Sequence, residues 1–242
     1  YRLTPAAAAL ISRAKLIFVV GPGLESFLVK PLAVLARKAR TVTLAEAPGV
    51  RLTPPTGKDN GRQASKSYGA YDPHIWLDPV NARAIVLAAV SALSKADPAN
   101  AARYTANGQN LDRRLATLDR SLRRRLAPIA DRPFMVYHND FAYLQRAYGL
   151  KIAGSVARRA GELMSAGRAR RLRALIRSRR IRCLFIGPLQ SRRSVRPLTD
   201  GLDVSLGVLD PFGMETKPGP ALYFHMMENM ARALEKCLSP AG

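Results

Sequence analysis

Short apolar runs alternate with helical patterns along this chain of 242 residues. Residues 15–20 read K-L-I-F-V-V, which is typical of a buried strand, and a G-P-G turn follows them. Residues 24–38 then have the spacing of a helix, and T-V-T-L-A at 41–45 resembles a second strand. The second half repeats this order with four more expected strands, at 133–138, 150–157, 182–187 and 204–210. Strands that alternate with helices predict an α/β fold with parallel sheets.

One helical pattern is much longer than the others and extends from about Pro98 to Leu126. At about 1.5 Å per residue such a helix is roughly 40 Å long, longer than most helices of globular proteins. We therefore expect two α/β lobes, at 1–97 and 128–242, joined by a rigid linking helix at 98–127. Lobes of this kind bind ligands in a cleft at the carboxyl ends of their strands.

Three further segments complete the expected organisation. Helices are expected at 81–95 and 223–238, where apolar residues recur at helical spacing. The segment 51–71 is rich in Pro, Gly, Lys and Ser, which is typical of a loop.

The net charge of +22 is the most unusual bulk property of the chain. A charge of this size suggests a polyanionic partner, either nucleic acid or an anionic surface. The arginine-rich segments 113–125, 157–173 and 177–182 keep leucine or alanine at helical spacing, and they lack the interleaved aromatic residues of a single-strand binding surface. This pattern favours solvated helix faces, so we expect no specific nucleic-acid partner. No apolar run reaches 18 residues, so no membrane span is predicted.

Candidate metal ligands follow the expected strands. His74 is one of three histidines and lies in D-P-H-I-W-L-D-P, beside the only tryptophan. His138 comes directly after the apolar run F-M-V-Y, and Asp210 directly after V-S-L-G-V-L. Two imidazoles and a carboxylate suit Zn²⁺, which takes four ligands in a tetrahedron. By spacing alone this is a weak signal, because three polar residues far apart in sequence could each be structural.

The chain has two cysteines, Cys183 and Cys237. They could form one disulfide, or both could be buried thiols, and the count does not separate these alternatives.

Four motifs in the same order resemble those of the metal-binding proteins that serve ABC importers of zinc and manganese, the cluster A-I solute-binding proteins. They are the segment 1–27, which begins Y-R-L-T-P and ends G-P-G-L-E-S-F, D-P-H-I-W-L-D-P at 72–79, V-Y-H-N-D-F-A-Y-L-Q-R-A-Y-G-L at 136–150 and V-L-D-P-F-G at 208–213. The resemblance extends over essentially the whole chain. It implies a monomeric, non-enzymatic protein that is periplasmic, or else extracytoplasmic and membrane-associated. Such a protein captures a divalent metal and delivers it to the membrane permease of an ABC importer.

The resemblance also implies a set of site residues. His74, His138 and Asp210 match metal ligands of the family. Asp72, Asp78 and Asp140 lie close to them in sequence and are expected to accept hydrogen bonds from ligand imidazoles. Asp78 has an alternative role, because an aspartate before Pro79 is also typical of a helix start.

The family's first histidine ligand lies two positions before the tyrosine that matches Tyr1. The first strand and helix of such proteins also precede that point. We expect the full-length protein to carry these parts upstream of Tyr1.

The match further implies zinc as the metal and a disulfide as a stabilising bond. Manganese-type members carry a glutamate where this chain has His138, and a nitrogen ligand favours zinc, with Mn²⁺ as the alternative. Cys183 and Cys237 match the positions of a disulfide in zinc members, which implies an oxidising compartment such as the periplasm. Two features depart from the family: the loop 51–71 contains no histidine, and Gly187 replaces a residue that is usually acidic.

Two other function classes stay open at this point. A zinc hydrolase would need an open coordination position and a general base such as Glu162, but the chain has no H-E-x-x-H motif. A protein that binds an anionic surface or nucleic acid is suggested by charge alone, and a steep salt dependence of binding would support it.

Overall fold

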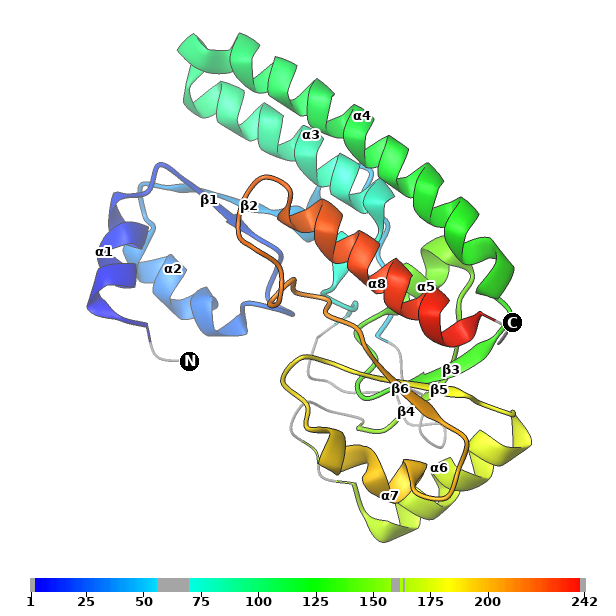
Figure 1. Cartoon of the computed structure of the whole chain (residues 1–242). Coiled ribbons are helices and arrows are strands. Elements are labelled where there is room, and N and C mark those ends of the chain that lie inside the picture. Colours follow the sequence, from blue (N-terminus) through cyan, green and yellow to red (C-terminus); the bar gives the residue numbers. More distant parts are fainter. Residues whose placement is uncertain (1–2, 56–69, 158–161, 163, 240–242) are drawn as a thin grey trace. The chain divides into compact units, whose positions relative to one another are not determined.

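The structure is a computed structural model that describes residues 3–55, 70–157, 162 and 164–239 (Figure 1). The chain divides into two compact units. The first takes in Tyr1–Pro55 and Lys66–Asp119, and the second takes in Arg120–Gly242. The border between them lies inside helix α4 (Ala101–Leu126), so this one helix contributes residues to both units. Most of the expected loop at 51–71 lies outside the described residues.

The first unit contains a parallel pair of strands, β1 (Leu16–Val19) and β2 (Arg40–Thr43). Leu16 lies opposite Arg40, and Val19 lies opposite Thr43. The helices and 3₁₀ turns of this unit are α1 (Pro5–Arg13), η1 (Ser26–Leu28), α2 (Val29–Leu35), η2 (Leu44–Glu46), η3 (Ile75–Leu77), α3 (Pro79–Ala96), η4 (Pro98–Asn100) and the first part of α4. Helix α1 was not among the elements expected from the sequence; it begins after Thr4, whose hydroxyl accepts a hydrogen bond from the amide of Ala7.

The helix expected at 24–38 is shorter in the structure, and Glu25 explains why it starts late. The Glu25 carboxylate accepts hydrogen bonds from the amides of Val20 at 3.1 Å and Gly21 at 2.9 Å. These bonds hold the turn between β1 and η1 outside the helix. Gly21 has a φ of +147°, and the Tyr71 hydroxyl lies where a β-carbon would stand. Only glycine satisfies both conditions at this turn.

Helices α3 and α4 pack closely within the first unit. Arg83 on α3 donates two hydrogen bonds to Asp112 on α4, from Nε at 2.6 Å and from Nη2 at 3.0 Å. Gly108 lies in the interior of α4, where glycine normally destabilises a helix. A β-carbon at this position would collide with the side chain of Val90 on α3, so the glycine permits the close approach.

The second unit is built on a four-stranded parallel sheet with the strand order β4-β3-β5-β6. Its elements, after the end of α4, are η5 (Ala127–Ile129), β3 (Pro133–Val136), α5 (Ala142–Tyr148), β4 (Lys151–Ser155), α6 (Ala166–Ser178), β5 (Cys183–Ile186), η6 (Arg192–Val195), α7 (Arg196–Thr199), β6 (Ser205–Val208) and α8 (Leu222–Leu238). Within this unit α6 and α7 lie on one side of the sheet and α8 on the other (Figure 1). The expected α/β fold with parallel sheets is confirmed. Each expected strand forms, and those of the second unit are two or three residues shorter than expected, chiefly at their carboxyl ends.

The core of the second unit lies on both faces of this sheet. All four residues of β5 are buried, as expected for a strand with neighbours on both sides. Between the sheet and the pair α6 and α7 lie Met135, Val156, Leu172, Ile176, Leu184, Ile186, Val195 and Leu198. On α8, Met227 and Leu234 are buried, and in the part of α4 that belongs to this unit Leu122 and Leu126 are buried.

A disulfide and an ion pair hold α8 in the second unit. Cys183 at the start of β5 is bonded to Cys237 in the last turn of α8. Arg125 on α4 donates two hydrogen bonds to Glu235 on α8, at 2.8 and 2.6 Å. Arg132 also donates to the carbonyl of Leu238 at 2.8 Å. None of the helices in the described part of the chain is long and apolar enough to cross a membrane.

We expect the pair Arg125–Glu235 to make the stability of the fold depend on pH. The hydrogen bonds from Arg125 lower the pKa of Glu235 in the folded protein. A carboxylate with a lowered pKa stabilises the fold above its unfolded pKa of about 4.3, and this contribution disappears as the pH falls through the folded pKa. Glu235→Gln should therefore destabilise the protein at neutral pH by up to about 1 kcal/mol, since both partners are partly exposed.

Thermal unfolding followed by circular dichroism across a pH series checks this expectation. The difference between wild type and Glu235→Gln should shrink to nothing once the pH is well below the folded pKa. Asp203→Asn, which removes an exposed carboxylate of the same unit, serves as the control and should change little at any pH. A difference that persists in acid would mean that the effect does not come from the ionised carboxylate.

Candidate metal centre

His74 is held by Asp72 in the first unit. Both side chains are only 3% exposed, and the Asp72 carboxylate oxygen Oδ1 lies 2.8 Å from His74 Nδ1. The same oxygen accepts a hydrogen bond from the backbone amide of His74 at 2.9 Å. Because an ionised carboxylate can only accept, this contact puts the imidazole proton on Nδ1 and the lone pair on Nε2. The ring also packs at a tilt against Trp76, with the ring centres 5.3 Å apart.

The segment after His74 is fixed by two further polar residues. Asp78 is the N-cap of α3: its carboxylate accepts from the amide of Val80 at 2.9 Å, and Pro79 is the first helical residue. Asn81 is fully buried, accepts from the amide of Arg51 at 2.8 Å and donates to the carbonyls of Arg51 and Ile75. Asn81 was not among the site residues expected from the sequence. Its only signal in the sequence is an amide side chain at the start of a strongly apolar helix.

His138 lies just beyond the carboxyl end of β3 in the second unit. Its Nε2 is 3.3 Å from the Asp140 carboxylate, and the two side chains are 16% and 17% exposed. They line a small hollow together with Phe141, Gly187 and Pro211. The hollow therefore lies at the carboxyl ends of β3, β5 and β6, where parallel sheets carry their ligand sites.

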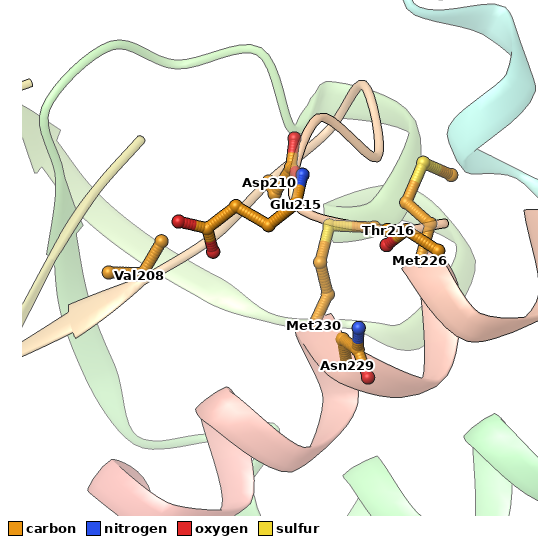
Figure 2. A pocket seen from close by; sticks show the side chains of 7 residues that line it. All are labelled: Val208, Asp210, Glu215, Thr216, Met226, Asn229 and Met230. Carbon is orange, nitrogen blue, oxygen red and sulfur yellow. The ribbon is translucent and has the colours of Figure 1, made fainter. Parts of the chain in front are cut away.

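Asp210 lies beyond the carboxyl end of β6. Its two carboxylate oxygens accept hydrogen bonds from the backbone amides of Phe212 at 3.1 Å and Glu215 at 2.9 Å. These bonds tie the loop 210–215 around the carboxylate and hold its charge in place. Figure 2 shows Asp210 and Glu215 beside the hollow that is lined on its α8 side by Met226, Asn229 and Met230.

The structure brings some of the expected site residues together. Asp72 contacts His74, and Asp140 contacts His138. Leu209 and Pro211, the neighbours of Asp210, line the same hollow as His138. His74 belongs to the first unit and the other two expected ligands to the second. Within residues 3–55, 70–157, 162 and 164–239, no three His, Cys, Asp or Glu side chains form a group that could hold a metal ion.

Two other residues singled out in the sequence have clear positions. Gly187 follows β5, and the side-chain amide of Gln190 lies over it, in the space that a β-carbon would need. His225, the third histidine, is exposed on α8.

The chain matches known proteins over nearly its whole length. The family model for the zinc-uptake complex component A, periplasmic (ZnuA), matches residues 1–237. The high-affinity zinc uptake system protein ZnuA of Brucella suis biovar 1 is 32% identical over 271 residues, which cover 99% of this chain and 81% of the relative.

Solved structures show the same fold. A crystal structure of ZnuA has a TM-score of 0.81 at 22% identity, covering 99% of this chain and 86% of that one. The structure of a Mn-bound periplasmic metal binding protein from Candidatus Liberibacter asiaticus has a TM-score of 0.76 at 20% identity, covering 98% and 86%.

These matches define the class as a solute-binding protein of an ABC transporter, which is a transport component and not an enzyme. Within that class, the chain belongs to the ZnuA family of periplasmic zinc-uptake proteins. Its function is to bind metal in the periplasm and deliver it to an ABC transporter, so it works as one part of a zinc-uptake complex. The disulfide Cys183–Cys237 agrees with an oxidising compartment.

Proposed function

We propose that the transported substrate is Zn²⁺ and that His74, His138 and Asp210 bind it through two imidazole nitrogens and one carboxylate. The observation that carries the proposal is the buried contact between Asp72 and His74. Histidines that bind metals almost always donate their second ring N–H to a carboxylate, a carbonyl or a water molecule. Such a bond sets the tautomer and turns the lone pair of the other nitrogen toward the ion.

The surroundings of His138 and Asp210 support their assignment as zinc ligands. Asp140 places a negative charge 3.3 Å from the His138 ring, and both residues line a hollow at the carboxyl ends of the strands. The Asp210 carboxylate accepts two backbone amide hydrogen bonds, which restrict its rotation. A carboxylate that is already fixed loses little conformational freedom when it binds a cation.

The ligand types favour zinc over manganese. Imidazole nitrogen is a good ligand for Zn²⁺, whereas Mn²⁺ prefers carboxylate, carbonyl and water oxygens. With two histidines and one aspartate, the proposed set has more nitrogen than an oxygen-rich manganese site. Mn²⁺ remains the alternative substrate within the same family.

We further propose that the protein acts as a monomer with lobes at 1–97 and 128–242, and that the long helix at 98–127 limits how far they move. Helix α4 supports this proposal, because its 26 residues contribute to both compact units. Metal bound between the lobes would stabilise a closed form that the permease recognises, and release would accompany opening.

A titration of the demetallated protein with Zn²⁺ and with Mn²⁺ tests the substrate assignment. We would follow it by calorimetry in the presence of a competing chelator. The expected result is one tight zinc site per chain and much weaker manganese binding. The absence of a stoichiometric zinc site, or tighter binding of manganese, would overturn the proposal.

A substitution at Asp72 tests the role of the buried contact. Asp72→Asn keeps the size and one acceptor oxygen but removes the negative charge next to the imidazole Nδ1. We expect the zinc affinity to fall by roughly 10- to 100-fold, as is typical when such a partner is lost. Asp203→Asn, at an exposed position, is the matched control and should bind zinc like wild type. Equal affinities of the two variants would show that Asp72 has only a structural role.

A further inference from the structure

Half of the net positive charge of the protein comes from one short segment of the second unit. Residues 165–199 contain eleven arginines and no aspartate, glutamate or lysine, while the whole chain has a net charge of +22. The segment includes α6, the turn after it, β5, η6 and α7. In Figure 1, α6 and α7 lie on the same side of the sheet of this unit.

Three of these arginines take part in holding the unit together. Arg168 donates to the carbonyls of Ser155 and Val156 at the end of β4. Arg173 donates to the carbonyls of Pro197, Leu198 and Asp200 and so joins α6 to the end of α7. Arg196 forms an exposed ion pair with Asp200 at 3.5 Å.

The other eight arginines are all exposed, and we call them the arginine surface. They are Arg170, Arg171, Arg177, Arg179, Arg180, Arg182, Arg192 and Arg193. Among the residues that the structure describes, none of the eight has a side-chain ion pair or hydrogen bond. On α6, the buried residues Leu172 and Ile176 face the core, and Arg170 and Arg177 lie on the opposite face of the helix.

Arg180 occupies a position at which glycine is the usual residue. Helix α6 ends in a Schellman motif, in which the amide of Ile181 donates to the carbonyl of Ile176 and the amide of Arg180 to that of Arg177. Arg180 has a φ of +51°, and it is the only residue other than glycine with a positive φ in the described part of the chain. A side chain in this conformation is strained, so the fold by itself favours glycine here. An arginine at such a site adds charge at the expense of stability.

We propose that the arginine surface binds the anionic phospholipid headgroups of a membrane bilayer. Basic residues near an acidic bilayer each contribute to binding through long-range attraction, without needing a pocket. A planar array of phosphate groups suits eight exposed, flexible side chains on α6, the turn after it and η6. The protein works in the periplasm with a membrane transporter, so a bilayer is within its reach. Binding would keep the protein in the layer of solvent next to its permease.

Nucleic acid fits this surface less well than lipid. Single-stranded nucleic acids are bound by basic grooves with aromatic side chains on which the bases stack. The only aromatic residue of the segment 165–199 is Phe185, and its side chain is 1% exposed.

The test compares binding of the full chain to vesicles of phosphatidylcholine alone and to vesicles of phosphatidylcholine and phosphatidylglycerol in equal parts. Cosedimentation at low ionic strength should show binding only to the vesicles that contain phosphatidylglycerol. The binding should weaken steeply as salt is added, because the screening length falls to about 3 Å at 1 M. The triple substitution Arg170→Gln, Arg171→Gln, Arg177→Gln should reduce the affinity by roughly a hundredfold, if each basic residue contributes its usual amount.

The matched control carries the same number of substitutions on another helix. Arg103→Gln, Arg113→Gln, Arg124→Gln removes three exposed arginines of α4 and leaves the same net charge as the first variant. It should lose no more than about threefold, since these residues lie outside the surface. Zinc affinity should stay unchanged in both variants, which separates this proposal from the assignment of the metal ligands. Equal losses in the two variants, or no binding of wild type to anionic vesicles, would overturn the proposal.

Arg180→Gly provides an independent check, because stability and binding should change in opposite directions. The thermal midpoint should rise by about 2–4 °C as the strained residue is replaced. Affinity for the phosphatidylglycerol vesicles should fall by roughly fivefold. A rise in thermal midpoint without any loss of vesicle binding would mean that Arg180 is not part of the binding surface.

Discussion

Replacing His138 with alanine is expected to lower the affinity for Zn²⁺ by roughly a hundredfold while the fold is retained. Tetrahedral zinc sites bind with about 10–16 kcal/mol in total, so one of four ligands accounts for about 3 kcal/mol. The side chain lies beyond the end of β3, in a hollow at the carboxyl edge of the sheet, and is 16% exposed. Its removal therefore leaves the core of the second unit intact. We expect the thermal midpoint of the metal-free protein to change little.

The control for this variant is His225→Ala. His225 is exposed on α8, so the same chemical change is made away from the proposed site. Calorimetry of the demetallated proteins against a competing chelator should give wild-type affinity for His225→Ala and a much weaker site for His138→Ala. If His138→Ala binds zinc as tightly as wild type, His138 is not a ligand.

The second large effect is a loss of stability, expected when the disulfide between Cys183 and Cys237 is removed. Cys183 and Cys237 are 54 residues apart in sequence, and a cross-link that closes a loop of this length stabilises a protein by about 4 kcal/mol in the chain-entropy model. The variant Cys183→Ala, Cys237→Ala should therefore have a thermal midpoint about 10 °C below that of wild type. Zinc affinity should change little, because the bond is at the amino end of β5 and the proposed ligands are at the carboxyl ends of the strands.

Treatment with a reducing agent provides the comparison for this prediction. Reduction should lower the thermal midpoint of wild type toward that of the double variant, and it should leave the variant itself unchanged. A wild-type protein whose midpoint does not respond to reduction would show that the bond contributes little to stability.

Several elements were predictable from the sequence because their signals are local. The strands β1, β3, β4, β5 and β6 coincide with short apolar runs, and α3 and α8 with long apolar patterns. The N-cap at Asp78 was expected as an alternative role from the Asp-Pro pair alone. Helix α1 was not expected, although the pair Thr4-Pro5 before its alanine-rich sequence is a short helix-start signal.

Contacts between distant residues were not predictable in the same way. The role of Asn81 depends on Arg51, which lies 30 positions earlier, and Gly108 is explained only by Val90 on the neighbouring helix. The sequence shows eleven arginines at 165–199, but only the structure shows which three of them form hydrogen bonds or an ion pair within the unit and which eight make up the arginine surface. The number of cysteines did not decide whether Cys183 and Cys237 form a disulfide, and only the family resemblance implied that they do.

The sequence by itself determined the order of strands and helices, the family and the candidate ligands, because periodicity and motifs lie within short segments of chain. The tertiary structure decided the contacts of each side chain with residues far away along the chain. Asp72 and His74 illustrate the difference: their spacing of two residues is visible in the sequence, but the buried 2.8 Å contact between them exists only in the folded unit. Burial removes competing water from this contact, so the fold turns a neighbouring carboxylate into a group that orients the imidazole.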